Sequence, residues 1–175
     1  VGEESGLVGS RHLDVAALNA SHGFVFDTAG AMGSITYWAP TEVDMTVTFK
    51  GRKAHAGVEP EKGIDAIRVA AEAVAAMPLG RIDEETVANI GTIAGGDARN
   101  IVPDHARLEG SARSHDQAKL DAQLDAMRAA CEAAAARHGA EMDFSSEEIY
   151  RTYRIRPDAP PFREAAAAIR ALGLE

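Results

Sequence analysis

Apolar and polar residues alternate clearly in the middle of the chain. The alternation runs over residues 43–49 and again over 105–113, and it predicts two half-buried strands. Residues 86–94 are rich in β-forming residues and predict another strand, which ends at the turn Gly95-Gly96. A final strand is predicted around residues 142–144, where Met142 and Phe144 flank a polar position.

Two stretches between these strands have helical periodicity. A helix after Pro60 is predicted to place four apolar residues on one face: Ile64, Ile67, Ala71 and Val74. A longer helix is predicted over 116–138, ending before Gly139, with the stripe Leu120, Leu124, Met127 and Cys131. The order β-α-β-β-α-β predicts an α+β fold of the ferredoxin-like type. Its antiparallel four-stranded sheet would have both helices on one face.

The two ends of the chain show less regular hydrophobic patterns than the middle. Residues 1–39 predict a helix, a short buried strand over 24–26 and, after a glycine-containing turn, another strand over 35–38. Pro40 marks a boundary. Residues 154–175 contain three prolines and then an alanine-rich helix over 162–172.

Charge and composition narrow the function classes. The 175 residues carry 18 Lys+Arg and 27 Asp+Glu, a net charge of −9, and the basic residues are scattered, which argues against a nucleic-acid partner. The single cysteine, Cys131, excludes an internal disulfide framework and favours a cytoplasmic location. No apolar run is long enough for a membrane span, so no membrane partner is expected. The missing initial Met suggests that the chain begins inside a longer protein.

Three carboxylates near the N-terminus are candidates for metal chemistry. Glu3 and Glu4 precede a tight turn into a helix, and Asp27 ends the apolar run over 24–26. Carboxylates at strand ends project into the crevice where open α/β sheets bind ligands. They are hard oxygen ligands, and a neighbouring Glu that does not bind the metal can act as general base. A solvated acidic pair is the alternative interpretation of Glu3 and Glu4.

Two further residues are candidates for substrate contacts. His55 lies among small residues in the segment Gly51–Gly57, where it could donate a hydrogen bond to a developing oxyanion. Arg113 falls on the polar face of its strand, where it could bind a carboxylate with two hydrogen bonds. A surface loop histidine and an exposed arginine on the sheet are the alternatives.

Together these motifs resemble the peptidase T-like branch of the aminoacylase/carboxypeptidase superfamily of zinc exopeptidases. The resemblance covers almost the whole chain and rests on five motifs in the family's order: Glu3–Ser10, Asp27, Gly51–Gly57, Ala98–Pro103 and Glu109–Ser114. It implies an α/β catalytic domain into which a ferredoxin-like lid, or dimerisation domain, is inserted. Residues 1–39 would then be part of the catalytic domain, 40–153 the lid, and 154–175 the start of the return to the catalytic domain.

The resemblance also implies roles for the candidate residues near the N-terminus. Two zinc ions are expected in the intact enzyme, which would hydrolyse peptide bonds in short peptides. Glu3 would be the general base, Glu4 a ligand of one zinc ion and Asp27 a ligand of the other.

The lid residues would complete the site. His55 resembles the lid histidine that reaches the active site of the partner subunit. Asn100 and Arg113 resemble the residues that hold the substrate backbone or carboxylate. The lid would form a two-fold homodimer with a continuous sheet across the interface.

The sequence departs from the family pattern at the metal ligands. Family members carry zinc histidines upstream of the Glu-Glu turn and near the C-terminus, and this sequence contains neither. The run His12-Leu13-Asp14 follows Glu4 and lies on a predicted helix, and the other histidines outside the Gly51–Gly57 motif are predicted to be structural: His22, His105, His115 and His138. A catalytic zinc site needs three protein ligands, so these 175 residues are expected to be an inactive fragment. Two alternatives stay open: an N-acyl amino acid amidohydrolase of the same superfamily, and a non-catalytic ferredoxin-like interaction module.

Overall fold

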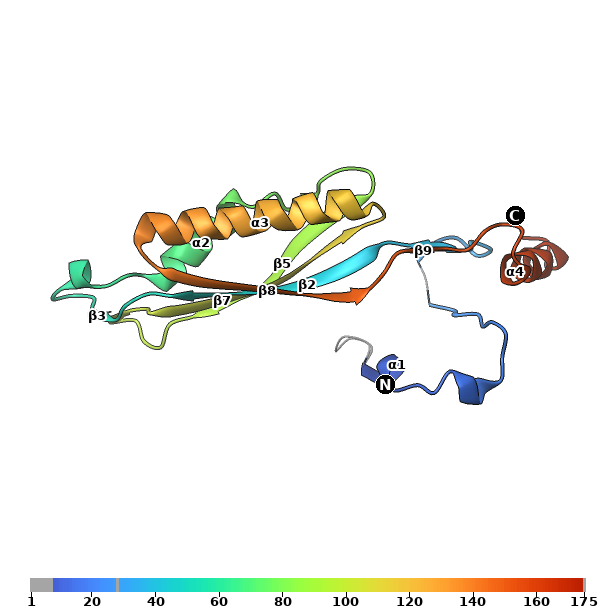
Figure 1. Ribbon diagram of the computed structural model, residues 1–175, viewed down its shortest axis with the longest axis horizontal. Coiled ribbons are helices and arrows are strands. Elements are labelled where there is room, and N and C mark those ends of the chain that lie inside the picture. Colours follow the sequence, from blue (N-terminus) through green and yellow to red (C-terminus); the bar gives the residue numbers. More distant parts are fainter. Residues whose placement is uncertain (1–7, 28, 175) are drawn as a thin grey trace. The chain divides into compact units, whose positions relative to one another are not determined.

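The computed structural model describes residues 8–27 and 29–174, and the backbone divides into two units (Figure 1). The central unit consists of residues 40–152, and the flanking unit consists of residues 1–39 and 153–175. The chain passes from one unit to the other at residues 39/40 and again at 152/153.

The central unit is built on a five-stranded sheet with the order β4-β5-β7-β2-β8, in which every pair of neighbours is antiparallel. Its four long strands and its short edge strand are β2 (Thr41–Lys50), β5 (Thr86–Gly95), β7 (His105–Ser114), β8 (Glu141–Tyr150) and β4 (Gly80–Arg81). The long strands confirm the predicted βαββαβ order. The sequence pattern missed β4, a two-residue strand that pairs with β5 only at residues 87–88.

Two helices pack on one face of this sheet, α2 (Ala66–Ala76) and α3 (Gln117–His138) (Figure 1). Each begins at an aspartate whose carboxylate accepts a hydrogen bond from a backbone N–H in the first turn: Asp65 from Arg68 at 3.0 Å, and Asp116 from Lys119 at 3.1 Å. Gly139 ends α3 in the left-handed conformation, with φ of 68°, as the sequence predicts.

The core lies between the sheet and the two helices. The alternation predicted over 43–49 is confirmed, because Val43, Met45, Val47 and Phe49 are buried. The predicted stripe of α3 is also confirmed, with Leu120, Met127 and Cys131 buried and Leu124 half-buried. These residues pack with apolar side chains of β7 and α2 into one cluster.

The predicted face of the first helix was wrong. Helix α2 buries Ala66, Val69, Ala70 and Ala73, whereas Ile67 is 40% exposed and Ile64 precedes the helix. Pro60 begins a separate 3₁₀ turn, η2 (Pro60–Lys62). Arg68 and Glu72 mark the polar side of α2, and the predicted face around Ile67 lies beside them and not opposite them.

The flanking unit contains short elements: α1 (Val8–Arg11), the 3₁₀ turn η1 (Ala16–Leu18), β1 (Trp38–Ala39), β9 (Tyr153–Arg154) and α4 (Pro160–Ala171). Strands β1 and β9 pair antiparallel. Next to them, the rings of Tyr37 and Phe162 meet edge to face, with 5.6 Å between their centroids.

The predicted strand over 24–26 was wrong. Residues 24–26 have no regular structure, and Phe26 is 97% exposed. A buried strand needs a neighbouring strand to pair with its backbone, and the described residues of the flanking unit provide none there. The strand predicted over 35–38 is also shorter than expected, because only Trp38 of that run lies in β1. None of the helices in the described part of the chain combines the length and apolar character needed to cross a membrane.

Candidate functional site

The predicted site residues lie in separate parts of the molecule. Glu3 and Glu4 are outside the described residues. Asp27 is exposed, in an irregular segment of the flanking unit. The other three belong to the central unit, where His55 and Asn100 lie near one end of the sheet and Arg113 lies near the other.

His55 and Asn100 come together in a projection that we call the tip, formed by residues 51–65 and 96–104. Here β3 (Ala54–His55) pairs antiparallel with β6 (Ile101–Val102), and His55 is in register with Ile101. The next backbone bond runs from the N–H of Ala56 to the carbonyl oxygen of Asn100, at 3.1 Å. Pairing of two short strands therefore fixes both predicted residues in one place.

The tip is tightly built around a glycine. A Cβ at position 51 would lie 2.0 Å from the carbonyl oxygen of Ile64, so only glycine fits there. This close approach accompanies a pair of backbone hydrogen bonds between Arg52 and Ile64, of 3.0 and 2.9 Å. Gly51 therefore makes room for the tip's own backbone.

The ring of His55 is oriented by its own loop. The backbone N–H of Gly57 donates a hydrogen bond to Nδ1 at 3.2 Å, and the side chain is exposed. In the neutral ring, an accepting Nδ1 leaves the proton on Nε2. His55 therefore presents Nε2–H as a hydrogen-bond donor.

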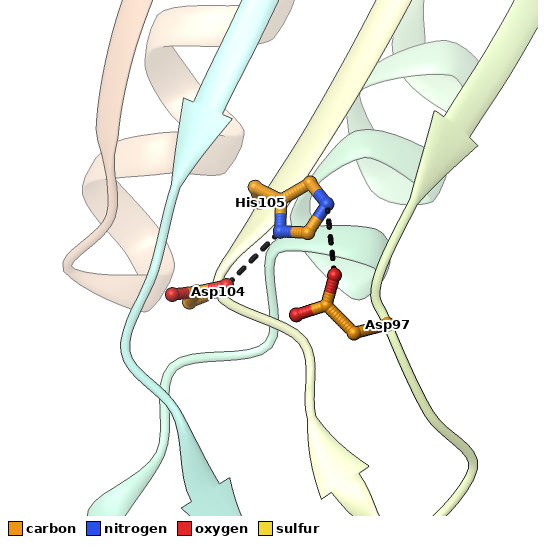
Figure 2. Close-up of side chains that lie close together, drawn as sticks. All are labelled: Asp97, Asp104 and His105. Carbon is orange, nitrogen blue, oxygen red and sulfur yellow. Dashed lines mark hydrogen bonds and ion pairs between the residues drawn. The ribbon is translucent and has the colours of Figure 1, made fainter.

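A charged cluster lies beside the two short strands. Figure 2 shows Asp97, Asp104 and His105, whose ligand atoms all lie within 4.8 Å of one another. His105 Nδ1 is 3.0 Å from an oxygen of Asp104, and Nε2 is 3.8 Å from an oxygen of Asp97. Lys53 joins the same cluster, with Nζ 2.7 Å from Asp97 and 3.7 Å from Asp104.

The two carboxylates of the cluster are held in their ionised form. The hydrogen bond from Lys53 holds the pKa of Asp97 below its ordinary value, and the hydrogen bond with His105 does the same for the pKa of Asp104. Two carboxylates and an imidazole are metal ligands by type. Here, however, the Lys53 ammonium already pairs with both carboxylates and offsets one of their two negative charges, which makes the cluster an ion-pair network.

No functional role was predicted for these four side chains, and His105 was predicted to be structural. Asp97 and His105 are eight residues apart and meet only because the chain turns back between β5 and β7. The sequence did contain a signal for this network: Asp97 and Asp104 lie on the two sides of that turn, and Lys53 lies close to His55.

An open groove runs along the tip next to this network. It is lined by the start of α2, by the turn after β5 and by β6, including Ile67, Gly96, Arg99 and Ile101. Gly96 has a φ of +73°, and a Cβ there would lie 3.2 Å from both Ile67 and Pro103. Apolar side chains, one arginine and the two carboxylates of Asp65 and Asp97 thus line one concave surface beside Asn100.

Arg113 lies near the end of β7, in register with Glu42 on β2 and Val87 on β5. Its guanidinium Nη2 is 2.5 Å from Glu42 Oε1, and about half of its side-chain surface is exposed. The guanidinium has five N–H donors, so this pair leaves capacity for a second carboxylate. Arg113 lies near both points where the chain crosses to the flanking unit, since Glu42 also pairs with Tyr150.

The two ends of the sheet are too far apart to share a small ligand within one chain. From His105 to Arg113, strand β7 rises by roughly 26 Å at about 3.3 Å per residue. The sheet therefore separates the His55–Asn100 end from the Arg113 end.

The antiparallel sheet with two helices on one face, in the order βαββαβ, defines a ferredoxin-like α+β domain. The family model for the peptidase dimerisation domain matches residues 42–139, more than half of the chain. The chain belongs to this M20 peptidase dimerisation-domain family.

Solved structures extend the likeness beyond the central unit. The chain is 41% identical to aminopeptidase PepT from Bacillus cereus, with a TM-score of 0.81. The match covers 99% of this chain and 47% of the PepT chain. The chain is 37% identical to a tripeptidase from Staphylococcus aureus, with a TM-score of 0.88. This match covers 100% of this chain and 47% of the tripeptidase chain. These likenesses confirm the peptidase T-like branch indicated by the motifs.

Among curated proteins, YqjE of Bacillus subtilis is 47% identical over 156 residues, which are 89% of this chain and 42% of YqjE. The chain thus spans about half the length of the relatives that it matches.

Proposed function

We propose that this chain is the lid and dimerisation part of a metal-dependent exopeptidase that hydrolyses short peptides, and that its tip completes the active site of a partner subunit. The observation that carries the proposal is that β3–β6 pairing brings His55 and Asn100 into one place. Two residues that the motifs assign to substrate contact lie on adjacent backbone segments, and the Nε2–H of His55 is presented to solvent. The solved relatives named as an aminopeptidase and a tripeptidase support the reaction class.

In this proposal each lid residue has a distinct chemical task. His55 Nε2–H donates to the oxygen that becomes negative when water attacks the scissile carbonyl, an interaction typically worth about 3 kcal/mol. The amide side chain of Asn100 binds the substrate backbone. Arg113, which already holds Glu42 with one nitrogen, receives the substrate carboxylate with the others.

The catalytic-domain part of the proposal concerns three carboxylates. Glu4 and Asp27 would bind zinc, which polarises the carbonyl when present, and Glu3 would take a proton from the attacking water and give it to the leaving amine. The carboxylate of Asp27 is exposed and is a suitable oxygen donor. Two carboxylates are fewer than the three protein ligands of a catalytic zinc site, so a complete site needs ligands beyond Glu4 and Asp27.

The separation of the two ends of the sheet is the reason for a shared site. Because roughly 26 Å of strand separates Arg113 from His105, and His55 lies in the tip beyond His105, a substrate that touches both His55 and Arg113 must lie between two copies. When edge strands of two copies pair antiparallel about a two-fold axis, the tip of one copy points toward the Arg113 end of the other. A dimer through the sheet edge therefore assembles the two halves.

The charges on the two edge strands favour β5 as the paired edge. Strand β8 carries Glu141, Asp143, Glu147 and Glu148, so pairing two copies of it would bring eight negative charges together. Strand β5 has no charged residue, and its Ile93 is 54% exposed. In the described part of the chain, only β4 pairs along its outer side, at residues 87–88.

The first test is activity. The full-length product of the gene that encodes this chain should hydrolyse tripeptides and lose activity in a chelator. His55→Ala should lower kcat by about 10²–10³-fold, while the matched control His12→Ala, which removes an exposed histidine of the flanking unit, should leave kcat unchanged. Hydrolysis of N-acyl amino acids in place of tripeptides would identify an amidohydrolase and contradict the proposal.

The second test asks whether the site is shared between subunits. His55→Ala and Arg113→Ala should each be inactive as pure proteins. After the two are unfolded together and refolded, half of the dimers are mixed, and each mixed dimer has one intact site, so activity should recover to about one quarter of the wild-type value. A site contained within one subunit would give no recovery.

The third test locates the interface. Ile93→Lys on β5 should convert the dimer into a monomer in sedimentation velocity, because it places like charges opposite each other. Ser145→Lys on β8 is the matched control and should leave the dimer intact. The reverse pattern would assign the interface to β8.

A further inference from the structure

Lys53 occupies a connecting position within the tip. It lies two residues before His55, and its partner Asp97 lies three residues before Asn100. Its second partner, Asp104, directly precedes β7. One ammonium group thus joins the segment that carries His55 to both ends of the segment that carries Asn100.

The remaining contacts make this connection a closed network. His105 also contacts both carboxylates, at 3.0 Å from Asp104 and 3.8 Å from Asp97 (Figure 2). The backbone of the same region adds a bond from the N–H of Gly51 to the carbonyl oxygen of Asp104, at 2.7 Å. Each side chain of the network is between one-third and about one-half exposed, so its ion pairs add little to global stability.

We propose that Lys53 is a positioning residue: through Asp97 and Asp104 it sets the spacing between His55 and Asn100 without touching the substrate. This inference rests on the proposed function for its catalytic consequence. Its structural part, the coupling of the two segments, stands independently of any activity.

The structural part is tested by hydrogen exchange on the 175-residue chain. Lys53→Met removes the charge and keeps the length of the side chain, and it should speed exchange of the Ala56 amide, which donates to Asn100, by about tenfold. Lys53→Arg should retain slow exchange. The amide of Leu108, in the buried middle of β7, should not change in either variant.

Lys62→Met is the matched control. Lys62 also lies in the tip and also makes an ion pair, at 2.6 Å from Glu59, but this pair is local to η2 and does not reach the segment of Asn100. It should leave the Ala56 amide unchanged. Unchanged exchange at Ala56 in Lys53→Met, or equal effects of Lys53→Met and Lys62→Met, would overturn the inference.

The catalytic consequence is measured in the full-length gene product. Lys53→Met should lower kcat and raise KM together, for a combined loss of about tenfold or more in kcat/KM, because both His55 and Asn100 lose their positions. A lower fraction of folded enzyme would lower kcat alone, and Lys53→Arg should restore both constants. If the wild-type enzyme hydrolyses no peptide but Lys53→Met still speeds exchange at Ala56, the proposed function fails and the positioning role of Lys53 remains.

Discussion

The central and flanking units use their apolar residues in opposite ways. All the buried apolar residues of the core lie between Val43 and Ala135, within the central unit. In the flanking unit, none of the side chains whose exposure is described is buried, and Phe24, Val25, Phe26 and Leu172 are exposed. The difference shows that apolar sequence makes a core only where neighbouring elements close over it. The central unit supplies both layers of its own core.

The largest effect should come from deleting a central side chain. Phe49→Ala removes a fully buried ring between β2 and the helices and should lower the free energy of unfolding by about 3–5 kcal/mol in urea titrations. Phe26→Ala is the matched control, because Phe26 is 97% exposed, and it should change stability by less than about 0.5 kcal/mol. Similar losses in the two variants would contradict the contrast between the units.

A smaller effect is expected from the backbone of the tip. Gly51→Ala places a methyl group against the carbonyl oxygen of Ile64 and should cost about 1–3 kcal/mol, with faster exchange of the Arg52 amide. Gly23→Ala, in the flanking unit, meets no atom within 4 Å and should be almost neutral. If Gly51→Ala were equally neutral, the tip would not be as tightly built as the structure indicates.

The helix N-termini also differ between the units: α3 of the central unit has a side-chain cap, and α4 of the flanking unit has none. Asp116→Ala removes the side-chain cap of α3 and should cost about 1 kcal/mol, measured from the urea midpoint. Helix α4 begins at Ala159, which provides no side-chain cap. Ala159→Asp should therefore raise the helical circular dichroism signal of the flanking unit without affecting the unfolding of the central unit. A loss of stability in Ala159→Asp would contradict this comparison.

The smallest effect should be a pH-dependent one between α2 and α3. His138 hydrogen-bonds Glu72 at 2.8 Å and Arg137 also contacts it, which holds the pKa of Glu72 below its ordinary 4.5. The ionised carboxylate therefore stabilises the fold above pH 4.5, and this stabilisation is lost as the pH falls through the lowered pKa. Urea midpoints of the wild type and Glu72→Gln should differ at pH 7 and converge once the pH falls below the lowered pKa of Glu72.

Glu132→Gln, which removes an exposed carboxylate on α3, is the control for that experiment. It should give parallel curves at both pH values. A gap between the wild type and Glu72→Gln that persists at low pH would mean that Glu72 acts through packing and not through its charge.

Local pattern was sufficient for most of the central unit. The alternation around Phe49 and the helix end at Gly139 are both determined by nearest neighbours along the chain, so the sequence predicts them. The packing face of α2 was missed because the pattern followed Ile67, a large apolar residue, and not the small alanines. Arg68 and Glu72 mark the solvent side of the helix, and the buried residues Ala66, Ala70 and Ala73 lie on the other side. The run at Phe24–Phe26 was misread because strand formation depends on a partner that sequence pattern does not reveal.

The candidate site also divides into residues that local motifs indicate and contacts that form only when the chain folds. His55 and Asn100 were identified from their motifs, and their shared location follows from β3–β6 pairing, which no local pattern predicts. The network of Lys53, Asp97 and Asp104 was missed because its members meet only after the chain folds back. The pair between Arg113 and Glu42 depends on the register of β7 against β2 and was missed for the same reason.

The entry and exit of the central unit lie next to each other. The backbone N–H of Thr152 donates to the hydroxyl oxygen of Thr41 at 3.0 Å, so the first and last residues of the fold are held together. A domain closed in this way can be gained or lost as one block of sequence, because a host chain needs only two neighbouring junctions to accept it. The same closure makes residues 40–152 transferable: they should graft into the surface loop of an unrelated protein and keep their own core.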